Sequence, residues 1–154
     1  MKPINSNEVF ENLKNLFSKN KIDLQNIFVL SIIAGKNISQ IQKGISFNDI
    51  YPQIIRVIPN TPALLSEEAI GYVFSDNVLA ENKEIAKRIL SSIGFIYEVD
   101  EKNMDDITAL SGSGQAYIFY LEEAMIKSGI EMGLNKEISE KLVIQTIFGS
   151  AKML

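Results

Sequence analysis

The side chains that most often carry acid–base, nucleophilic or metal chemistry are scarce in this sequence. It contains neither histidine nor cysteine, which excludes imidazole bases, disulfides and thiolate chemistry. Any reaction must therefore depend on a bound cofactor, on carboxylates or hydroxyls, or on the positioning of a substrate. Runs of small residues are the second chemical signal, because a backbone without bulky side chains lets a ligand approach closely.

One such run covers residues 110–117 and reads Leu-Ser-Gly-Ser-Gly-Gln-Ala-Tyr. We predict a loop here that leads into a long helix. The free N–H groups at a helix N-terminus attract anions, so the loop is a candidate anion site. A plain helix cap explains the same residues and remains the alternative.

A second run, Ile33-Ala34-Gly35, ends a continuous apolar stretch over residues 27–33. Such a stretch is typical of a strand buried on both faces of a parallel sheet, and α/β folds bind ligands at the carboxyl ends of these strands. A tight turn between a strand and a helix needs the same glycine. The pair Ala34-Gly35 therefore indicates either a ligand site or a turn.

The next apolar stretch, Gln53–Ile58, leads into Pro59-Asn60-Thr61-Pro62, where two prolines fix a rigid, non-helical exit. Arg56 lies inside this stretch. A charge buried in a strand must find a partner. We predict a structural ion pair for Arg56 rather than an anion site.

The remaining periodicities complete an alternation of helices and strands. Helices are predicted at residues 7–17, 38–45 and 82–92, and strands at residues 69–74 and 95–98. This order predicts an α/β, Rossmann-like domain over residues 1–99, which is partial and has a mostly parallel sheet.

From residue 100 onward the sequence has only helical periodicity, which predicts an all-α helical domain over residues 100–154. Its long first helix has a narrow polar stripe, Glu123, Lys127 and Glu131, so we expect it to be mostly buried. Gly133 is placed to end this helix and Asn135 to cap the next. Two antiparallel helices cannot bury so much apolar surface on each other, so the surplus must meet the other domain or a second subunit.

Composition excludes several classes of protein. The chain has 154 residues, 46% hydrophobic and 22% charged, with a net charge of -4. Without a basic cluster, nucleic acid and anionic membranes are not expected partners. No stretch approaches the ~20 apolar residues of a membrane span, so we expect a cytoplasmic protein.

Six blocks of sequence resemble those of the pyrroline-5-carboxylate reductase family, in order and at fitting spacings. They are Lys2-Pro3, residues 31–35, residues 56–63, residues 100–105, residues 108–114 and residues 149–154. The resemblance implies reduction of 1-pyrroline-5-carboxylate to L-proline with NADPH or NADH as the cofactor. It also implies a Rossmann domain followed by a helical dimerisation domain that interlocks two subunits, and hence a homodimer or larger homo-oligomer with Tyr120 and Phe148 among its buried residues.

The resemblance also implies which residues face the cofactor. They are Met1, Lys2 and Pro3, which lie beside it; Ile33, Ala34 and Gly35, near the nicotinamide; and Glu101, an acidic residue implicated in cofactor contact. Two positions depart from the family pattern, Ile58 where methionine is usual and Gln115 where proline is usual. No catalytic, substrate-binding or metal-binding residue is assigned.

The family's glycine fingerprint and its Ser-Pro-Gly-Gly-Thr-like substrate segment have no counterpart in these residues. The resemblance is thus to the central portion of a reductase, and we expect this polypeptide alone to bind NADPH weakly or not at all and to show no reduction. Two alternatives remain open. One is a non-catalytic dimerisation remnant. The other is a β-hydroxyacid-type dehydrogenase, although such enzymes usually carry a lysine on the long helix and residues 116–125 have none.

Overall fold

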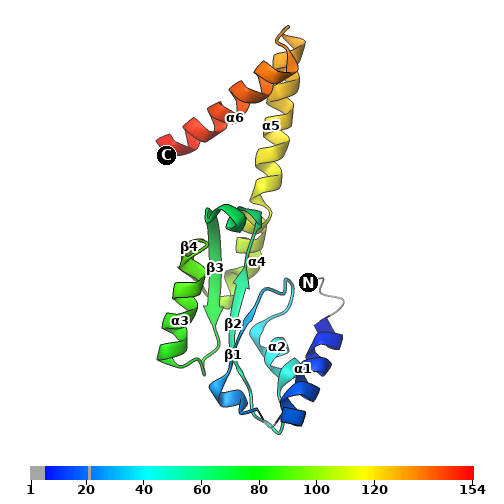
Figure 1. Ribbon diagram of the computed structural model, residues 1–154, viewed down its shortest axis with the longest axis vertical. Coiled ribbons are helices and arrows are strands. Elements are labelled where there is room, and N and C mark those ends of the chain that lie inside the picture. The colour runs from blue at the N-terminus through cyan, green and yellow to red at the C-terminus, as the bar shows by residue number, and fades with distance from the viewer. Residues whose placement is uncertain (1–5, 21) are drawn as a thin grey trace. The chain divides into compact units, whose positions relative to one another are not determined.

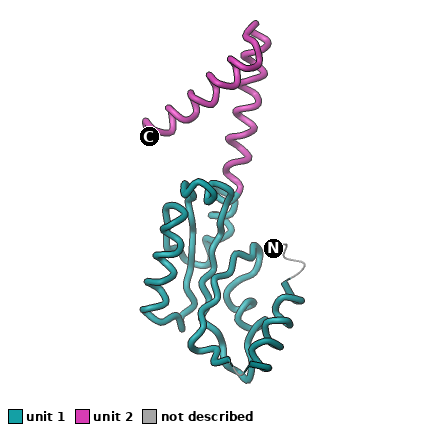
Figure 2. The backbone as a smooth tube through the Cα atoms, in the orientation of Figure 1, with its two compact units in different colours: residues 1–112 teal, residues 113–154 magenta. Residues whose placement is uncertain are grey.

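The computed structural model describes residues 6–20 and 22–154 (Figure 1). Met1, Lys2 and Pro3, predicted beside the cofactor, lie outside the described residues. The chain forms two compact units, Met1–Gly112 and Ser113–Leu154 (Figure 2). The division falls later in the chain than the boundary predicted from periodicity, because residues 101–112 pack with the first unit.

The first unit is built on a four-stranded sheet in the order β1-β2-β3-β4. The strands are β1 Phe28–Ser31, β2 Gln53–Ile58, β3 Glu68–Phe74 and β4 Gly94–Glu98. β1 pairs with β2 and β3 with β4 in parallel, which confirms the mostly parallel α/β sheet. β2 and β3 are antiparallel, a reversal that the sequence did not reveal. Only the short 3-10 helix η3, Thr61–Leu65, joins them, and a parallel crossover needs a longer connection.

Helices flank the sheet on both faces. Those of the first unit are α1 Ser6–Asn20, α2 Ile38–Ile45, α3 Ala80–Ser91 and the short α4 Met104–Ile107, with 3-10 turns η2 Leu24–Asn26 and η4 Glu101–Asn103. The predicted bounds of α2 and β2 are confirmed, and the other predicted elements differ only at their ends. α2 starts where it does because Asn37 and Gln40 form a reciprocal capping box.

Successive residues of β2 point to opposite faces of the sheet and belong to two separate hydrophobic cores. Ile54 packs with residues of α1 and α2, including Phe10 and Ile41. Ile55 packs with β3 and α3 in a second cluster. Figure 1 shows α1 and α2 together on one side of the strands and α3 on the other. The sheet is thus fixed from both faces.

The second unit is a helix pair, α5 Gly114–Glu131 and α6 Lys136–Met153. The turn between them has the predicted residues in the predicted roles. Gly133 adopts a φ of 101°, a conformation that favours glycine, and Leu134 N–H donates to the Gly129 carbonyl at 3.1 Å. Asn135 then caps α6 by accepting from Ile138 N–H. The helices lie together at this turn and diverge away from it (Figure 1).

The predicted loop over residues 110–117 is wrong, because this segment is helical. A π-helix, η5 Thr108–Gly112, continues from α4, and α5 follows after Ser113. The hydroxyls of Thr108 and Ser111 donate to the carbonyls of Met104 and Ile107, four residues earlier. The chain therefore does not enter α5 from an extended loop, and the anion site predicted on such a loop loses its basis.

The prediction that α5 is mostly buried is wrong for the single chain. Tyr120 is 76% exposed and Phe148 of α6 is 54% exposed. The small residues Gly129 and Ser139 are buried where the helices approach each other. The surplus of apolar surface predicted for this unit is therefore present and uncovered within one chain. No helix among the described residues is long and apolar enough to cross a membrane.

Close contact between α1 and α2 generates a testable prediction at Gly44. A Cβ there would lie 2.3 Å from Phe10 Cδ2, and the Phe10 ring is buried in the first core. We expect Gly44→Ala to reduce the free energy of unfolding by about 1–3 kcal/mol through overpacking, measured by urea denaturation. The control is a double-mutant cycle with Phe10→Leu. The two effects should be less than additive, and full additivity would contradict the contact.

Candidate functional site

The carboxyl ends of β1 and β2 meet at one edge of the sheet because these strands are parallel. Ser31, the last residue of β1, is paired with Arg56 of β2. Residues 32–35 leave this edge toward α2, and Pro59-Asn60 leave it toward η3. This edge is where α/β sheets of this kind bind ligands.

The turn after β1 presents its smallest residues to solvent. Ile33 is only 5% exposed and belongs to the core around α1 and α2, whereas Ala34 and Gly35 are exposed. Gly35 has a φ of 72°, in the left-handed region, and apart from its own and its two chain neighbours' atoms no heavy atom lies within 4 Å of the position that its Cβ would occupy. The turn therefore offers a methyl group and bare backbone to open space, while Ile33 anchors it from inside.

Glu101, the first residue of η4 after β4, contacts the residue that follows this turn and begins α2. Its Oε1 accepts a hydrogen bond from Ile38 N–H at 2.6 Å and lies 3.6 Å from Arg56 Nη1. Arg56 is only 3% exposed, and its Nη2 lies 3.7 Å from the exposed carboxylate of Asp105. The ion pair predicted for Arg56 is confirmed. Glu101 and Asp105 could not be named as its partners from the sequence, because they lie about 45–50 residues later, after β3 and β4.

The structure thus brings together two groups of the predicted cofactor-facing residues, Ile33-Ala34-Gly35 and Glu101, on either side of the start of α2. The third group, Met1, Lys2 and Pro3, lies outside the described residues. The contact of each with a cofactor stays a prediction.

The start of α2 is suited to an uncharged group rather than to a phosphate. The Ile38 N–H is bound by Glu101, the Gln40 N–H by the Asn37 side chain and the Ile41 N–H by the Asn37 carbonyl. A phosphate at this helix N-terminus would find these donors taken and would meet the Glu101 carboxylate. The turn at Ala34 and Gly35, by contrast, is exposed and has open space where a Gly35 side chain would lie.

Asn60 and Glu68 fix the exit of β2, and neither was predicted as a site residue. Asn60 Nδ2 donates to the Ser111 carbonyl at 2.9 Å, and Asn60 N–H donates to the Glu68 carboxylate. Glu68 is 1% exposed. Burial raises the pKa of Glu68, and the Asn60 hydrogen bond opposes this only in part. The signal in the sequence was the pair of prolines around Asn60, which indicated a rigid exit but not its contacts.

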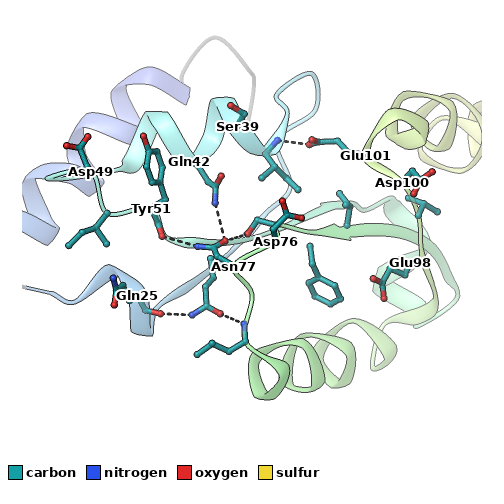
Figure 3. A pocket seen from close by; sticks show the side chains of 18 residues that line it. Gln25, Ser39, Gln42, Asp49, Tyr51, Asp76, Asn77, Glu98, Asp100 and Glu101 are labelled. Carbon is teal, nitrogen blue, oxygen red and sulfur yellow. Dashed lines mark hydrogen bonds between the residues drawn. The ribbon is translucent and has the colours of Figure 1, made fainter.

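A groove of about 1040 Å³ adjoins the turn but does not include it (Figure 3). Ile38 and Glu101 line it, and residues 33–35 do not. An amide network crosses it, in which Gln42 Nε2 donates to Asn77 Oδ1 at 3.2 Å and Asn77 Nδ2 to the Tyr51 carbonyl at 3.1 Å. Its carboxylates are Asp49, Asp76, Glu98, Asp100 and Glu101. No group of carboxylates among the described residues is arranged to hold a metal ion.

Glu68 makes the stability of this edge depend on pH. Because its pKa is raised on folding, the folded chain holds the proton more tightly than the unfolded chain. Protonation of Glu68 contributes fully to the free energy of unfolding when the pH is below the ordinary carboxyl pKa. This contribution is lost as the pH rises through the raised pKa of the folded chain. Glu68→Gln keeps the acceptor for Asn60 N–H and cannot ionise. We expect the variant to gain stability relative to wild type as the pH rises, measured by urea denaturation from about pH 4 to about pH 8. A difference that is constant over this range would contradict the assignment.

Comparison with known proteins supports the family resemblance over the whole chain. A family model for pyrroline-5-carboxylate reductase dimerisation matches residues 101–154. Pyrroline-5-carboxylate reductase 2 of Bos taurus is 38% identical over 126 residues, which cover 82% of this chain and 39% of that protein. Pyrroline-5-carboxylate reductase 1 of Bacillus subtilis is 32% identical over 154 residues, which cover 100% of this chain and 49% of that protein.

Solved structures agree with these matches. The crystal structure of the Plasmodium falciparum pyrroline carboxylate reductase with NADP bound has a TM-score of 0.86 and 35% identity, and the alignment covers 99% of this chain and 58% of that one. The reductase of Coxiella burnetii has a TM-score of 0.82 and 34% identity, with 99% and 54% covered. The chain spans less than half the length of the two curated relatives above. The sequence blocks, the sheet with its helix pair and these matches agree that the chain is similar to pyrroline-5-carboxylate reductases.

Proposed function

We propose that this chain is the section of an NAD(P)H-dependent reductase that faces the nicotinamide and joins two subunits, in an enzyme that reduces 1-pyrroline-5-carboxylate to L-proline. The observation that carries the proposal is the open turn at Ala34 and Gly35, at the carboxyl edge of two parallel strands. Ile33 and Ile38 on either side of this turn are buried in the first core. The turn is therefore a fixed platform of small residues.

Such a platform suits the chemistry of an imine reductase. Reduction of a cyclic C=N bond adds a hydride to carbon and a proton to nitrogen, and bound NADPH would supply the hydride. Transfer requires the two reacting atoms to be held about 3–3.5 Å apart. In the proposal the role of Ala34 and Gly35 is to let one face of the ring lie against the backbone, so that its other face is turned to the substrate. A larger side chain at either position would displace the ring.

Binding at the turn can be tested directly by NMR. We expect NADPH to shift the amide signals of Ala34, Gly35 and their neighbours in the ¹⁵N-labelled chain. Ala34→Trp should weaken this binding by about tenfold, since the indole would fill the space of the ring. Ala80→Trp, at an exposed alanine that begins α3, is the matched control and should bind as wild type does. No shifts at residues 33–38 up to about 10 mM NADPH, or shifts centred instead on the groove around Asn77, would contradict the proposal.

Catalysis should be measured on the native protein, purified from the cells that produce it. We expect NADPH oxidation that requires 1-pyrroline-5-carboxylate, with L-proline identified as the product by mass spectrometry. Ala34→Trp should lower kcat/KM by about tenfold or more, and Ala80→Trp should not. Absence of proline formation by the intact protein would reject the reductase and leave a dimerisation remnant as the remaining function.

The proposed partner of the second unit is a second copy of this chain. Its helices expose large apolar side chains in both halves: Tyr117, Phe119, Tyr120, Leu121, Ile138, Leu142, Ile144 and Phe148. At about 25 cal/mol per Å², several hundred Å² of such surface left in water would cost many kcal/mol. The match of residues 101–154 to a dimerisation family supports the same occupant.

Association has a simple test. We expect sedimentation equilibrium to show a dimer or larger assembly at about 10 µM, and Tyr120→Glu and Phe148→Glu each to shift it toward monomer, because a charge in an apolar interface stays unpaired. Lys127→Glu, on the polar stripe of α5, is the control for charge alone and should not dissociate the assembly. A wild-type monomer at this concentration would contradict the proposal.

A further inference from the structure

Glu101 is held by two donors on one oxygen. Oε1 accepts the Ile38 N–H at 2.6 Å and lies 3.6 Å from Arg56 Nη1, and Figure 3 shows the bond to the start of α2. The hydrogen bond from Ile38 N–H is strengthened by the charge of the carboxylate, and the Arg56 guanidinium adds an ion pair at a longer distance. The oxygen that points toward α2 is therefore engaged within the protein.

Arg56 holds Glu101 in place from the centre of the sheet. It is paired with Ser31 on one side and with Val73 on the other, and only 3% of it is exposed. The two ladders fix the main chain of Arg56, and burial together with the two ion pairs restrains its guanidinium. Glu101 is consequently fixed relative to the end of β1, although it follows β4 in the chain.

The turn at Ala34 and Gly35 depends on its two ends for its position. Ala34 and Gly35 are exposed, and open space lies where a Gly35 side chain would be, so Ile33 is the only one of residues 33–35 that is buried in the core. Its first end is Ser31, paired in the sheet. Its second end is Ile38, the first residue of α2, whose N–H is bound by Glu101 and whose side chain is buried. Loss of the Glu101 contact would release the Ile38 N–H and remove one of the contacts that hold this end of the turn.

We propose that Glu101 is a positioning residue, which fixes the nicotinamide-facing turn through the Ile38 N–H and does not itself touch the cofactor. This inference rests on the proposed function of that turn. It replaces the direct cofactor contact that the family resemblance implied for Glu101. Oε1 is engaged by Arg56 and α2, so a direct contact with the cofactor would fall to Oε2 alone, and the substitutions below separate that role from the positioning role.

The test compares three substitutions of Glu101. Glu101→Gln keeps an oxygen at the same reach, so Ile38 N–H retains its acceptor. Glu101→Asp keeps the charge but withdraws it by one methylene, and Glu101→Ala removes the acceptor. The matched control is Asp105→Asn, because Asp105 also faces Arg56, at 3.7 Å, but no hydrogen bond joins its side chain to α2 among the described residues. Thermal melting establishes that each variant is folded.

The first readout is amide hydrogen exchange in the absence of cofactor. We expect exchange at Ile38 to be faster by about tenfold in Glu101→Ala and Glu101→Asp, and to stay within about threefold of wild type in Glu101→Gln and Asp105→Asn. The second readout is NADPH affinity from the NMR titration, which should follow the same order of variants. If Glu101→Ala does not fold, the contrast between Glu101→Asp and Glu101→Gln gives the same answer.

Two failures are distinguishable. If NADPH shifts residues 33–38 in wild type but Glu101→Asp or Glu101→Ala weakens binding without changing exchange at Ile38, Glu101 contacts the cofactor directly and the inference is wrong. If faster exchange at Ile38 leaves NADPH affinity unchanged, the positioning role is likewise rejected. If NADPH produces no shifts at residues 33–38 in wild type, the proposed function fails and the inference fails with it.

Discussion

The buried charge of Arg56 is the constraint on which the first unit depends. A guanidinium at 3% exposure cannot remain without an anion, and the structure supplies Glu101 at 3.6 Å and Asp105 at 3.7 Å. Both anions come from the segment that follows β4, so this segment must return across the sheet to reach β2. The return places Glu101 against the start of α2 and packs α4 onto β3, where Ile107 lies over Gly71. One buried charge thus determines where the chain goes after its last strand.

The same return explains why residues 101–112 belong to the first unit by their contacts, while the family model for dimerisation already begins at residue 101. Asn60 binds the Ser111 carbonyl, so the π-helix is tied to the exit of β2. π-helices are uncommon and are often found at functional sites, and this one lies directly before α5. Within the first unit, its contact with Asn60 ties the end of residues 101–112 to the exit of β2.

Sequence reasoning found the elements whose causes are local. The span of α2 followed from its apolar spacing, the end of α5 from Gly133 and the start of α6 from Asn135, because capping and periodicity act over a few residues. It failed where partners are distant. The antiparallel β2–β3 pair, the anions around Arg56 and the burial of Glu68 all depend on residues brought together by the fold. It also took residues 110–117 for a loop, because glycine and serine lower helix propensity, and tertiary contacts of Asn60 and Ile58 outweigh that preference here.

The two units differ in how they are stabilised. Unit two has few buried residues, so α5 and α6 gain little stability from each other and depend on a partner for the rest. Unit one has two cores of its own and needs no such partner to hold the turn at Ala34 and Gly35 in place.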